Sequence, residues 1–394
     1  MSSQSEKLLG EDATDACSLL DWTSHYLINS RDQPLEIVLQ SPRDNHTDIY
    51  ECMDPLIDML VEESQRWKRV HLSLPGVQME TLDLDETLPV LEFLHLHVNN
   101  FPLFVYGIPT FATPQLQELI ISAVSFPLSS ELPEFEFLAS LTKLRLYHVS
   151  VYSTLHYLSQ APLNLSVNAY LAFEYDGPLV TAPIVSHIDT LTTLSAGDLT
   201  IAECNDPLGD LFNNISSLPN IHLFDFTGNE CQGRPFPHTS FISFLSRRRP
   251  DETPITKLSL KEWLLKDDFL VQILDLLPAL EHLTIDENFR PARLAPWIYK
   301  SRDRTLSSSF LRALQIPTSN SICKCLLPRL TNLTLIFEMK VDYQAMKNMI
   351  QSRRGNLRLV SRLDWVSISV PRRLVDIKNV RALRTMGDVV VKLV

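Results

Sequence analysis

The sequence predicts an α/β protein in which one short strand recurs along most of the chain, and three observations support this fold class. An apolar-x-x-apolar-x-apolar pattern recurs, with most copies roughly 25–34 residues apart. The last two apolar positions alternate with their neighbours, as in a strand with one buried face. Several segments between the copies have the apolar spacing of amphipathic helices.

The repeated pattern places the predicted strands. Its copies begin at Leu91, Leu116, Leu141, Leu191, Ile221, Ile255, Leu280, Leu311, Leu330 and Leu363, with a degenerate copy at Trp67 and an unrecognised one expected at 163–170. This pattern and period are typical of leucine-rich repeats. Because one repeat cannot bury its apolar edge alone, we predict a solenoid. It would be an irregular horseshoe with parallel strands on its concave face and helices and loops on its convex face.

The domain division follows from the same pattern. Residues 1–18 are predicted to be a disordered polar N-terminus, 19–76 the N-terminal region of the array (a strand, a helix and the first degenerate repeat), and 77–394 the irregular repeats. Helices are predicted at 50–67, 154–160, 239–246, 267–277 and 343–352, and loop insertions at 204–211 and 230–237. Several strands follow a proline, at Pro89, Pro219, Pro254, Pro278 and Pro328, where it precedes the hydrogen-bonded ladder.

Glycine is scarce, with ten among 394 residues. One or two doubly wound α/β domains, the alternative fold, would need glycine-rich turns at a ligand-bearing edge. Gly228 and Gly233 have the glycine spacing of a phosphate-binding loop, but the lysine and hydroxyl residue of that motif do not follow. The sequence also carries no esterase, zinc-protease or kinase signature. We therefore predict a non-enzymatic protein without a cofactor.

Two short clusters have residue types that bind metals. His95 and His97 lie two residues apart on a predicted strand, so their side chains share one face. No further ligands with suitable spacing lie nearby in the sequence, and exposed strand histidines are the ordinary explanation. Cys323 and Cys325 lack the second cysteine pair of a zinc site. We therefore predict no metal site.

The candidate functional residues alternate with the buried positions and are expected to point onto the concave face. They are Phe93, His95, His97, Lys143, Arg145, Tyr147, Lys257, Lys261, His282 and Trp365. Aromatic rings mixed with charges are typical of protein-binding surfaces. Another protein is therefore the predicted partner on this face.

Charge is unevenly divided along the chain. Residues 290–394 hold 20 basic and 6 acidic side chains, a balance of +14, whereas residues 1–289 hold 15 and 41, a balance of −26. A basic C-terminal third could bind nucleic acid. Its basic residues are dispersed among apolar repeat positions, however, and no nucleic-acid-binding motif accompanies them. Nucleic acid is therefore not the expected partner.

The compartment is predicted from what the sequence lacks. The first residues are polar and acidic and contain no apolar signal core. No stretch approaches the roughly 18 apolar residues that cross a bilayer. The six cysteines are scattered, unlike a disulfide framework. We expect an intracellular protein, cytoplasmic or nuclear, without a membrane partner.

Several segments carry a resemblance to a known family. They include LLDWTSHYLINSRDQPLEIVL from Leu19, ESQRWKRVHLSLPG from Glu63 and FISFLSRRRPDETPITKLSL from Phe241. The Pro-Leu-x-Ile-x-Leu and Arg-Trp-x-x-Val-x-Leu-x-Leu-Pro signatures within them are moderately specific. From about residue 18 to its end, the chain resembles the F-box/leucine-rich-repeat proteins of mushroom-forming fungi.

The resemblance implies an adaptor role. In this family an F-box attaches the protein to a Skp1–cullin ubiquitin ligase, and the repeats select the substrate. The F-box would lie upstream of Leu19, where this chain has 18 polar residues. A truncated gene product and a repeat-only relative both fit this departure. A Skp1-like adaptor is therefore expected as a partner only where an F-box precedes the repeats.

Overall fold

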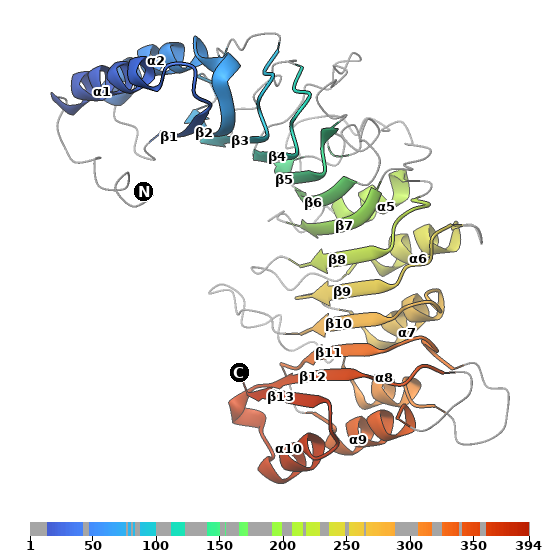
Figure 1. The fold of residues 1–394 in the computed structure, drawn as a ribbon. Helices are drawn as coiled ribbons and strands as arrows, with labels where there is room; N and C mark the ends of the chain where they lie inside the picture. Colours follow the sequence, from blue (N-terminus) through green and yellow to red (C-terminus); the bar gives the residue numbers. More distant parts are fainter. Residues whose placement is uncertain are drawn as a thin grey trace. The chain divides into compact units, whose positions relative to one another are not determined.

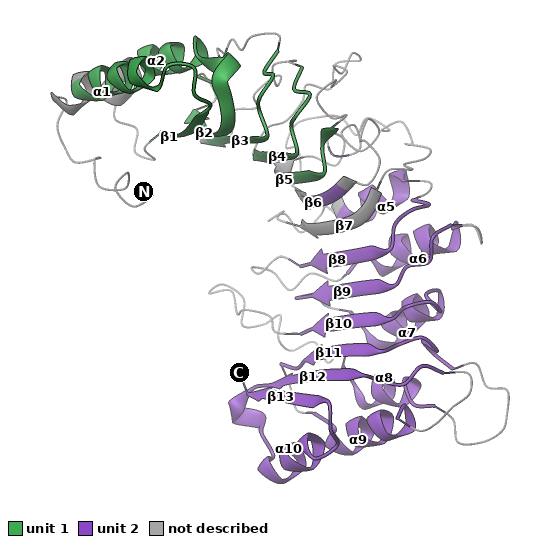
Figure 2. Cartoon of the chain, in the orientation of Figure 1, with its two compact units in different colours: residues 1–145 green, residues 146–394 purple. Residues whose placement is uncertain are grey.

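A computed structural model describes the parts of the chain on which the following account rests. They are residues 14–41, 47–75, 78–79, 82, 87–99, 112–122, 140–149, 154, 165–171, 191–198, 207–215, 218–228, 236–248, 252–263, 265–287, 306–316, 325–338, 341–354 and 360–393. The chain divides into two compact units, residues 1–145 and 146–394 (Figure 2). Each unit is described by itself.

The first unit begins with two α-helices separated by a strand and continues with further parallel strands (Figure 1). Its elements are α1 (Thr14–Ser30), β1 (Leu35–Gln40), α2 (Thr47–Val61), the 3₁₀ helix η2 (Ser64–Arg66), β2 (Trp67–Pro75), β3 (Phe93–Asn99), β4 (Glu118–Ser122) and the start of β5 (Lys143–Val149). β1 to β4 pair in chain order, and each pair is parallel. The apolar repeat positions form the core beneath this sheet: Leu91, Leu94 and Leu96 are all buried.

The second unit begins with two strands and then alternates helices with strands. Its elements are β6 (Leu165–Leu171), β7 (Leu191–Asp198), α5 (Pro207–Asn214), β8 (Leu223–Thr227), α6 (His238–Ser246), β9 (Lys257–Lys261), α7 (Asp267–Asp275), β10 (His282–Asp286), α8 (Ser308–Ala313), β11 (Asn332–Ile336), α9 (Tyr343–Ser352), β12 (Trp365–Val370), the 3₁₀ helix η5 (Arg372–Leu374), α10 (Ile377–Arg384) and β13 (Val389–Leu393). β6 to β13 pair in chain order, again all in parallel. The predicted α/β class is confirmed.

A recurring turn explains the prolines before the strands. The backbone N–H at the first apolar position donates to the carbonyl three residues earlier, as in Leu91 to Leu88 and Leu330 to Leu327. The same bond recurs at Leu116, Ile221 and Leu280. In each case proline is the second residue of the turn, the position for which its fixed φ is suited. The N–H of the following residue then donates to the carbonyl of the equivalent residue in the preceding repeat copy, as from Glu281 to Thr256.

Most predicted elements are found, with shifted ends. The helix predicted at 343–352 matches α9, and those predicted at 239–246, 267–277 and 50–67 correspond to α6, α7 and α2. The unrecognised copy expected at 163–170 is β6. The predicted helix at 154–160 and the insertion at 230–237 lie mostly outside the described residues.

The copy that begins at Leu311 was predicted wrongly as a strand. Ser308–Ala313 is the helix α8, and β10 pairs directly with β11, without an intervening strand. The Ser307 hydroxyl accepts from the Phe310 N–H and caps this helix. Leu311 and Leu314 are fully buried. Their spacing of three residues fits one face of a helix as well as it fits the repeat pattern.

Two further predictions need correction. The segment 204–211 was predicted as a loop insertion, but α5 begins at Pro207, where proline suits the first turn of a helix. Disorder was predicted for residues 1–18, but α1 begins at Thr14. No proline or glycine interrupts residues 14–18, so the helix continues upstream of Leu19. Residues 1–13 lie outside the described part of the chain.

Candidate functional site

The predicted binding residues of the first unit lie on one face of its sheet. The strand register aligns Arg69, Phe93 and Glu118 in one row across β2, β3 and β4. His71, His95 and Ile120 form the next row, and Ser73, His97 and Ser122 the third. Because alternate side chains of a strand share a face, these rows lie opposite the buried leucines. We call this surface the first-unit face.

The first row of this face holds an aromatic ring between charged groups. The Arg69 guanidinium carbon lies 4.7 Å from the centre of the Phe93 ring, within cation–π range. The Glu118 carboxylate lies 2.9 Å from Arg145 Nη2 and 3.9 Å from Lys143 Nζ. These partly exposed ion pairs contribute little to stability, but they hold their side chains in place on the sheet.

The second row brings two histidines into contact. His95 Nδ1 lies 3.0 Å from His71 Nδ1, and the two ring centres are 4.1 Å apart. In such a hydrogen bond one ring donates its Nδ1–H and the other accepts at Nδ1, so the accepting ring is neutral and carries its proton on Nε2. Burial, together with the neighbouring His71, His97 and Arg145, lowers the pKa of His95 to about 4. Burial also lowers the pKa of His71.

His97, in the third row, places another imidazole ring near His95. Its ring centre lies 6.5 Å from that of His95. Sequence reasoning considered His95 and His97 as a possible metal pair. Within the described ranges, no group of three or more His, Cys, Asp or Glu side chains is arranged to hold a metal ion.

The remaining predicted residues lie on the corresponding face of the second unit. Lys257, His282 and Trp365 align in one row with Leu223 and Asn332. Trp365 ends this row on β12 and is 45% exposed. We call this surface, formed by the outward residues of β8 to β12, the second-unit face.

Two other predicted residues of the second unit lie outside that row. Lys261 is four residues after Lys257 on β9, and its Nζ lies 2.9 Å from the Asp225 carboxylate. Tyr147 is a half-buried residue of β5. The predicted residues are therefore described as one group in each unit.

An outward position does not guarantee exposure. Ile120 shares the row of His95 but is buried, as is Ser122 in the row of His97. On β12, Ser367 and Ser369 are buried although they alternate with core positions. The usable binding surface is therefore smaller than the alternation predicts.

The contact between His71 and His95 was missed by sequence reasoning, although the sequence contains its signal. Both residues occupy the fifth position of their repeat copies, which begin at Trp67 and Leu91. Parallel stacking of those copies in register places the two imidazoles side by side.

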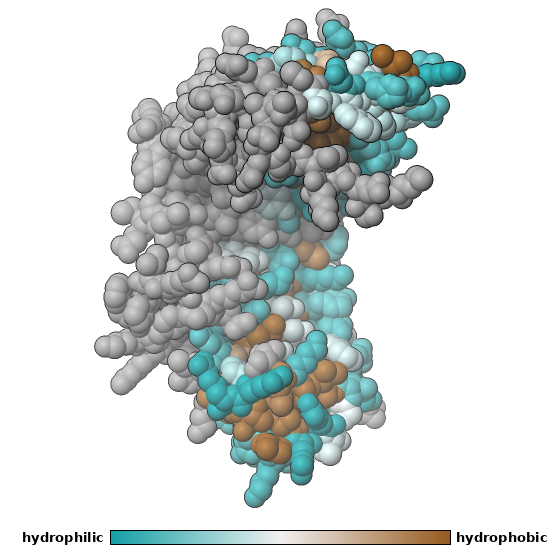
Figure 3. All heavy atoms as spheres, turned by 90° about the vertical axis from the view of Figure 1, so that its left-hand side faces the viewer, coloured by the Kyte–Doolittle hydropathy of each residue, from teal (hydrophilic) through white to brown (hydrophobic). Residues whose placement is uncertain are grey.

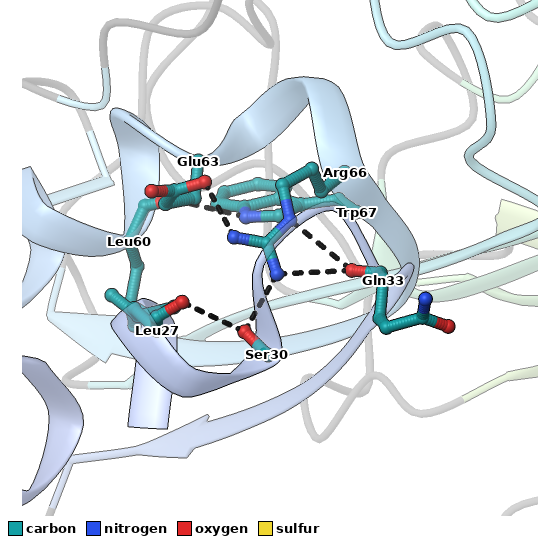
Figure 4. A network of polar contacts seen from close by, with 7 residues as sticks. All are labelled: Leu27, Ser30, Gln33, Leu60, Glu63, Arg66 and Trp67. Carbon is teal, nitrogen blue, oxygen red and sulfur yellow. Dashed lines mark hydrogen bonds and ion pairs between the residues drawn. The ribbon is translucent and has the colours of Figure 1, made fainter. Parts of the chain in front are cut away.

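The Arg-Trp signature has a structural role beneath β2 (Figure 4). Arg66 Nε and Nη2 donate to the Gln33 carbonyl at 3.1 and 3.0 Å, and Nη2 also donates to Ser30 Oγ at 2.6 Å. Arg66 Nη1 pairs with the Glu63 carboxylate at 2.8 Å. Trp67 is almost fully buried, and its indole N–H donates to the Leu60 carbonyl at 3.0 Å. The two residues thus tie the ends of α1 and α2 to the start of the sheet.

Comparison with known proteins adds no family assignment: no family model matches this chain, and no curated protein matches it. Among the helices that the structure describes, none is long and apolar enough to span a membrane.

Proposed function

We propose that this chain is a leucine-rich-repeat protein that binds another protein through the outward faces of its strands. The observation that carries the proposal is the alignment of aromatic and charged side chains in rows across adjacent parallel strands. Phe93, Arg145 and Trp365 are residue types that dominate protein interfaces. The faces hold these side chains on strands, which are more rigid than loops.

Repetition of one local unit supports the repeat assignment. The proline turn, the N–H bond to the preceding strand and the buried apolar triad recur together in both units. A repeat of this kind contacts its neighbours in sequence, as in solenoid proteins. In a leucine-rich-repeat solenoid, successive copies of the leucine pattern form consecutive parallel strands, as most copies do in each unit of this chain.

The electrostatics of the first-unit face favour a protein partner over a polyanion. At neutral pH the contacting His71 and His95 are uncharged, because burial lowers both pKa values. The basic side chains of Arg145 and Lys143 are already paired with Glu118. An interface with neutral and aromatic groups at its centre and ion pairs around it matches the usual anatomy of protein recognition.

We further propose, on the family resemblance, that the bound protein is a substrate presented to a Skp1–cullin ubiquitin ligase. The chain would be a non-catalytic, substrate-selecting adaptor within the cell. The alternative role is that of a repeat-only scaffold without ligase attachment.

Affinity capture with matched variants tests the binding proposal. The first-unit variant carries Phe93→Ala and Arg145→Glu, the second-unit variant Lys257→Glu and Trp365→Ala, and the control Gln344→Ala on the exposed side of α9. A true partner is captured by the wild type and by the control. The captured amount falls at least about tenfold with one face variant. The partner is then purified and its affinity measured by calorimetry. Binding of that purified partner unchanged by both face variants would exclude these faces.

A separate pull-down tests ligase attachment. Purified Skp1 is offered to this chain and to a form that includes the coding sequence upstream of it. Capture by the longer form supports the adaptor role through an upstream F-box. Failure of both forms would reject ligase attachment and leave the scaffold role.

A further inference from the structure

The N-terminal helices present an acidic surface with exposed aromatic rings. Asp21, Asp32, Asp58 and Glu62 are exposed, and Arg31 is the one Lys or Arg among the described residues from 18 to 62. Leu19, Trp22 and Tyr26 follow the i, i+3, i+7 spacing of one helical stripe on α1. Trp22 is 74% exposed and Tyr26 is 61% exposed. We call Asp21, Trp22, Tyr26, Asp58 and Glu62 the acidic end.

The last elements of the second unit present the opposite charge. Arg372, Lys378, Arg381 and Lys392 are exposed on η5, α10 and β13. Within the described ranges, no ion pair neutralises these cations. The nearby Asp376 accepts hydrogen bonds from the N–H groups of Lys378 and Asn379 and caps α10.

Apolar side chains accompany these cations. Ile377 is 64% exposed at the start of α10, and Leu393 of β13 is also exposed. In Figure 3 hydrophobic residues flanked by hydrophilic ones gather over the C-terminal elements, at the lower end of the view. We call Arg372, Ile377, Lys378, Arg381 and Lys392 the basic end.

We propose that copies of this chain associate end to end, with the acidic end of one copy docked on the basic end of the next. Each end combines exposed apolar side chains with an excess of charge of one sign, and the two signs are opposite. Large apolar side chains exposed together are typical of interaction surfaces. Complementary charge steers such surfaces together and fixes their orientation.

A second copy explains both ends at once. A nucleic acid or an anionic membrane would match the cations of the basic end but not the exposed carboxylates of the acidic end. Because the two contacting surfaces differ, the contact is heterologous: each added copy leaves one free acidic end and one free basic end. Such a contact produces a ring if the rotation closes and an open filament if it does not.

Charge-swap variants test this proposal with the full chain. The acidic-end variant carries Asp21→Lys, Asp58→Lys and Glu62→Lys, and the basic-end variant carries Arg372→Glu, Lys378→Glu and Arg381→Glu. The control carries Lys143→Glu and Lys257→Glu, two exposed lysines on the outward sheet faces. Circular dichroism establishes that all three remain folded. Sedimentation velocity then follows each protein over a concentration series, at about 0.02 M and about 0.5 M salt.

The wild type and the control should show a sedimentation coefficient that rises with concentration at low salt and falls towards the monomer value at high salt. Each end variant alone should remain monomeric over the same series. An equimolar mixture of the two end variants should associate again. In that mixture every contact pairs a basic surface with an acidic one.

Three results would overturn the proposal. They are a wild type that stays monomeric at low salt, end variants that associate as the wild type does, and a mixture that fails to restore association. Binding of heparin or anionic vesicles by a monomeric wild type, lost in the basic-end variant, would assign the basic end to a polyanion or a membrane instead. The proposal does not rest on the proposed function, because the control alters the outward faces while leaving both ends intact.

Discussion

Acidification should destabilise the first unit through the contact between His71 and His95. Protonation of the accepting Nδ1 breaks the hydrogen bond between the rings, and a positive charge on His95 lies beside His71 and near Arg145. The folded pKa of His95 is about 4, whereas the ordinary histidine value is 6.5. The unfolded chain therefore binds a proton at a higher pH than the folded chain does. Stability from this group is fully present above pH 6.5 and is lost as the pH falls from 6.5 towards 4.

The magnitude follows from the width of this window. A shift of one pKa unit corresponds to about 1.4 kcal/mol, so an unscreened shift of this size would amount to about 3 kcal/mol. His95 is only half-buried, and solvent screening reduces the value to about 1–2 kcal/mol. His71 changes stability in the same direction, because burial lowers its pKa as well. We expect a fall of about 1 kcal/mol in the free energy of unfolding between pH 7.5 and pH 5 from this pair.

Urea denaturation at the two pH values measures this effect, with His95→Phe as the test variant. Phenylalanine keeps a ring in the row but does not titrate, so part of the pH dependence should disappear. His282→Phe, on the second-unit face, is the matched control and should leave the pH dependence of the first unit unchanged. NMR titration of the histidine ring protons gives the pKa directly. A His95 pKa at or above 6.5 would refute the reasoning.

Three substitutions test interactions within each unit. Arg66→Ala removes the hydrogen bonds to Gln33 and the ion pair with Glu63. It should lower the free energy of unfolding by about 1–3 kcal/mol. A thermal midpoint equal to that of the wild type would contradict a stabilising role for Arg66. Gly228→Ala would place a Cβ 2.2 Å from the Glu262 carbonyl oxygen. We therefore expect the free energy of unfolding, measured by urea denaturation, to fall by at least about 1–3 kcal/mol. An unchanged value would show that the backbone after β8 and the backbone after β9 move apart easily. Arg353→Met removes the donors for three backbone carbonyls and should cost at least about 2 kcal/mol by the same assay. A midpoint equal to that of the wild type would contradict this role of Arg353.

Strand positions could be predicted because each short strand is largely a local consequence of its sequence. In the copy that begins at Leu280, the proline turn fixes the start and alternation places Leu283 and Ile285 in the core. Neighbouring copies stack in parallel, so the same alternation also identified the outward residues Lys257 and His282. These predictions needed no knowledge of distant contacts.

The contacts between outward residues could not be predicted in the same way. Glu118 has two basic neighbours on β5, and nothing in its own repeat shows that Arg145 forms the shorter pair. The burial of Ile120 and the low pKa of His95 depend on all the strands and loops that pack around them. Periodicity predicts which way a side chain points, whereas burial and charge are properties of the assembled unit.

The misassigned copy at Leu311 shows how the fold accommodates a repeat that has no strand. β10 pairs directly with β11, so no strand of this copy lies between them, and the carbonyls of Leu314, Leu326 and Leu327 lie outside the strand pairings. The fully buried Arg353, which follows α9, supplies donors instead: it binds the carbonyls of Leu314, Leu326 and Leu327. Burial lowers the pKa of Arg353, yet arginine stays protonated because its ordinary pKa is so high. Its planar group of five donors can satisfy several carbonyls together, which a single-point ammonium cannot do as well. One long side chain thus takes over the bonding that a strand provides elsewhere, and the apolar pattern of the sequence gives no sign of it.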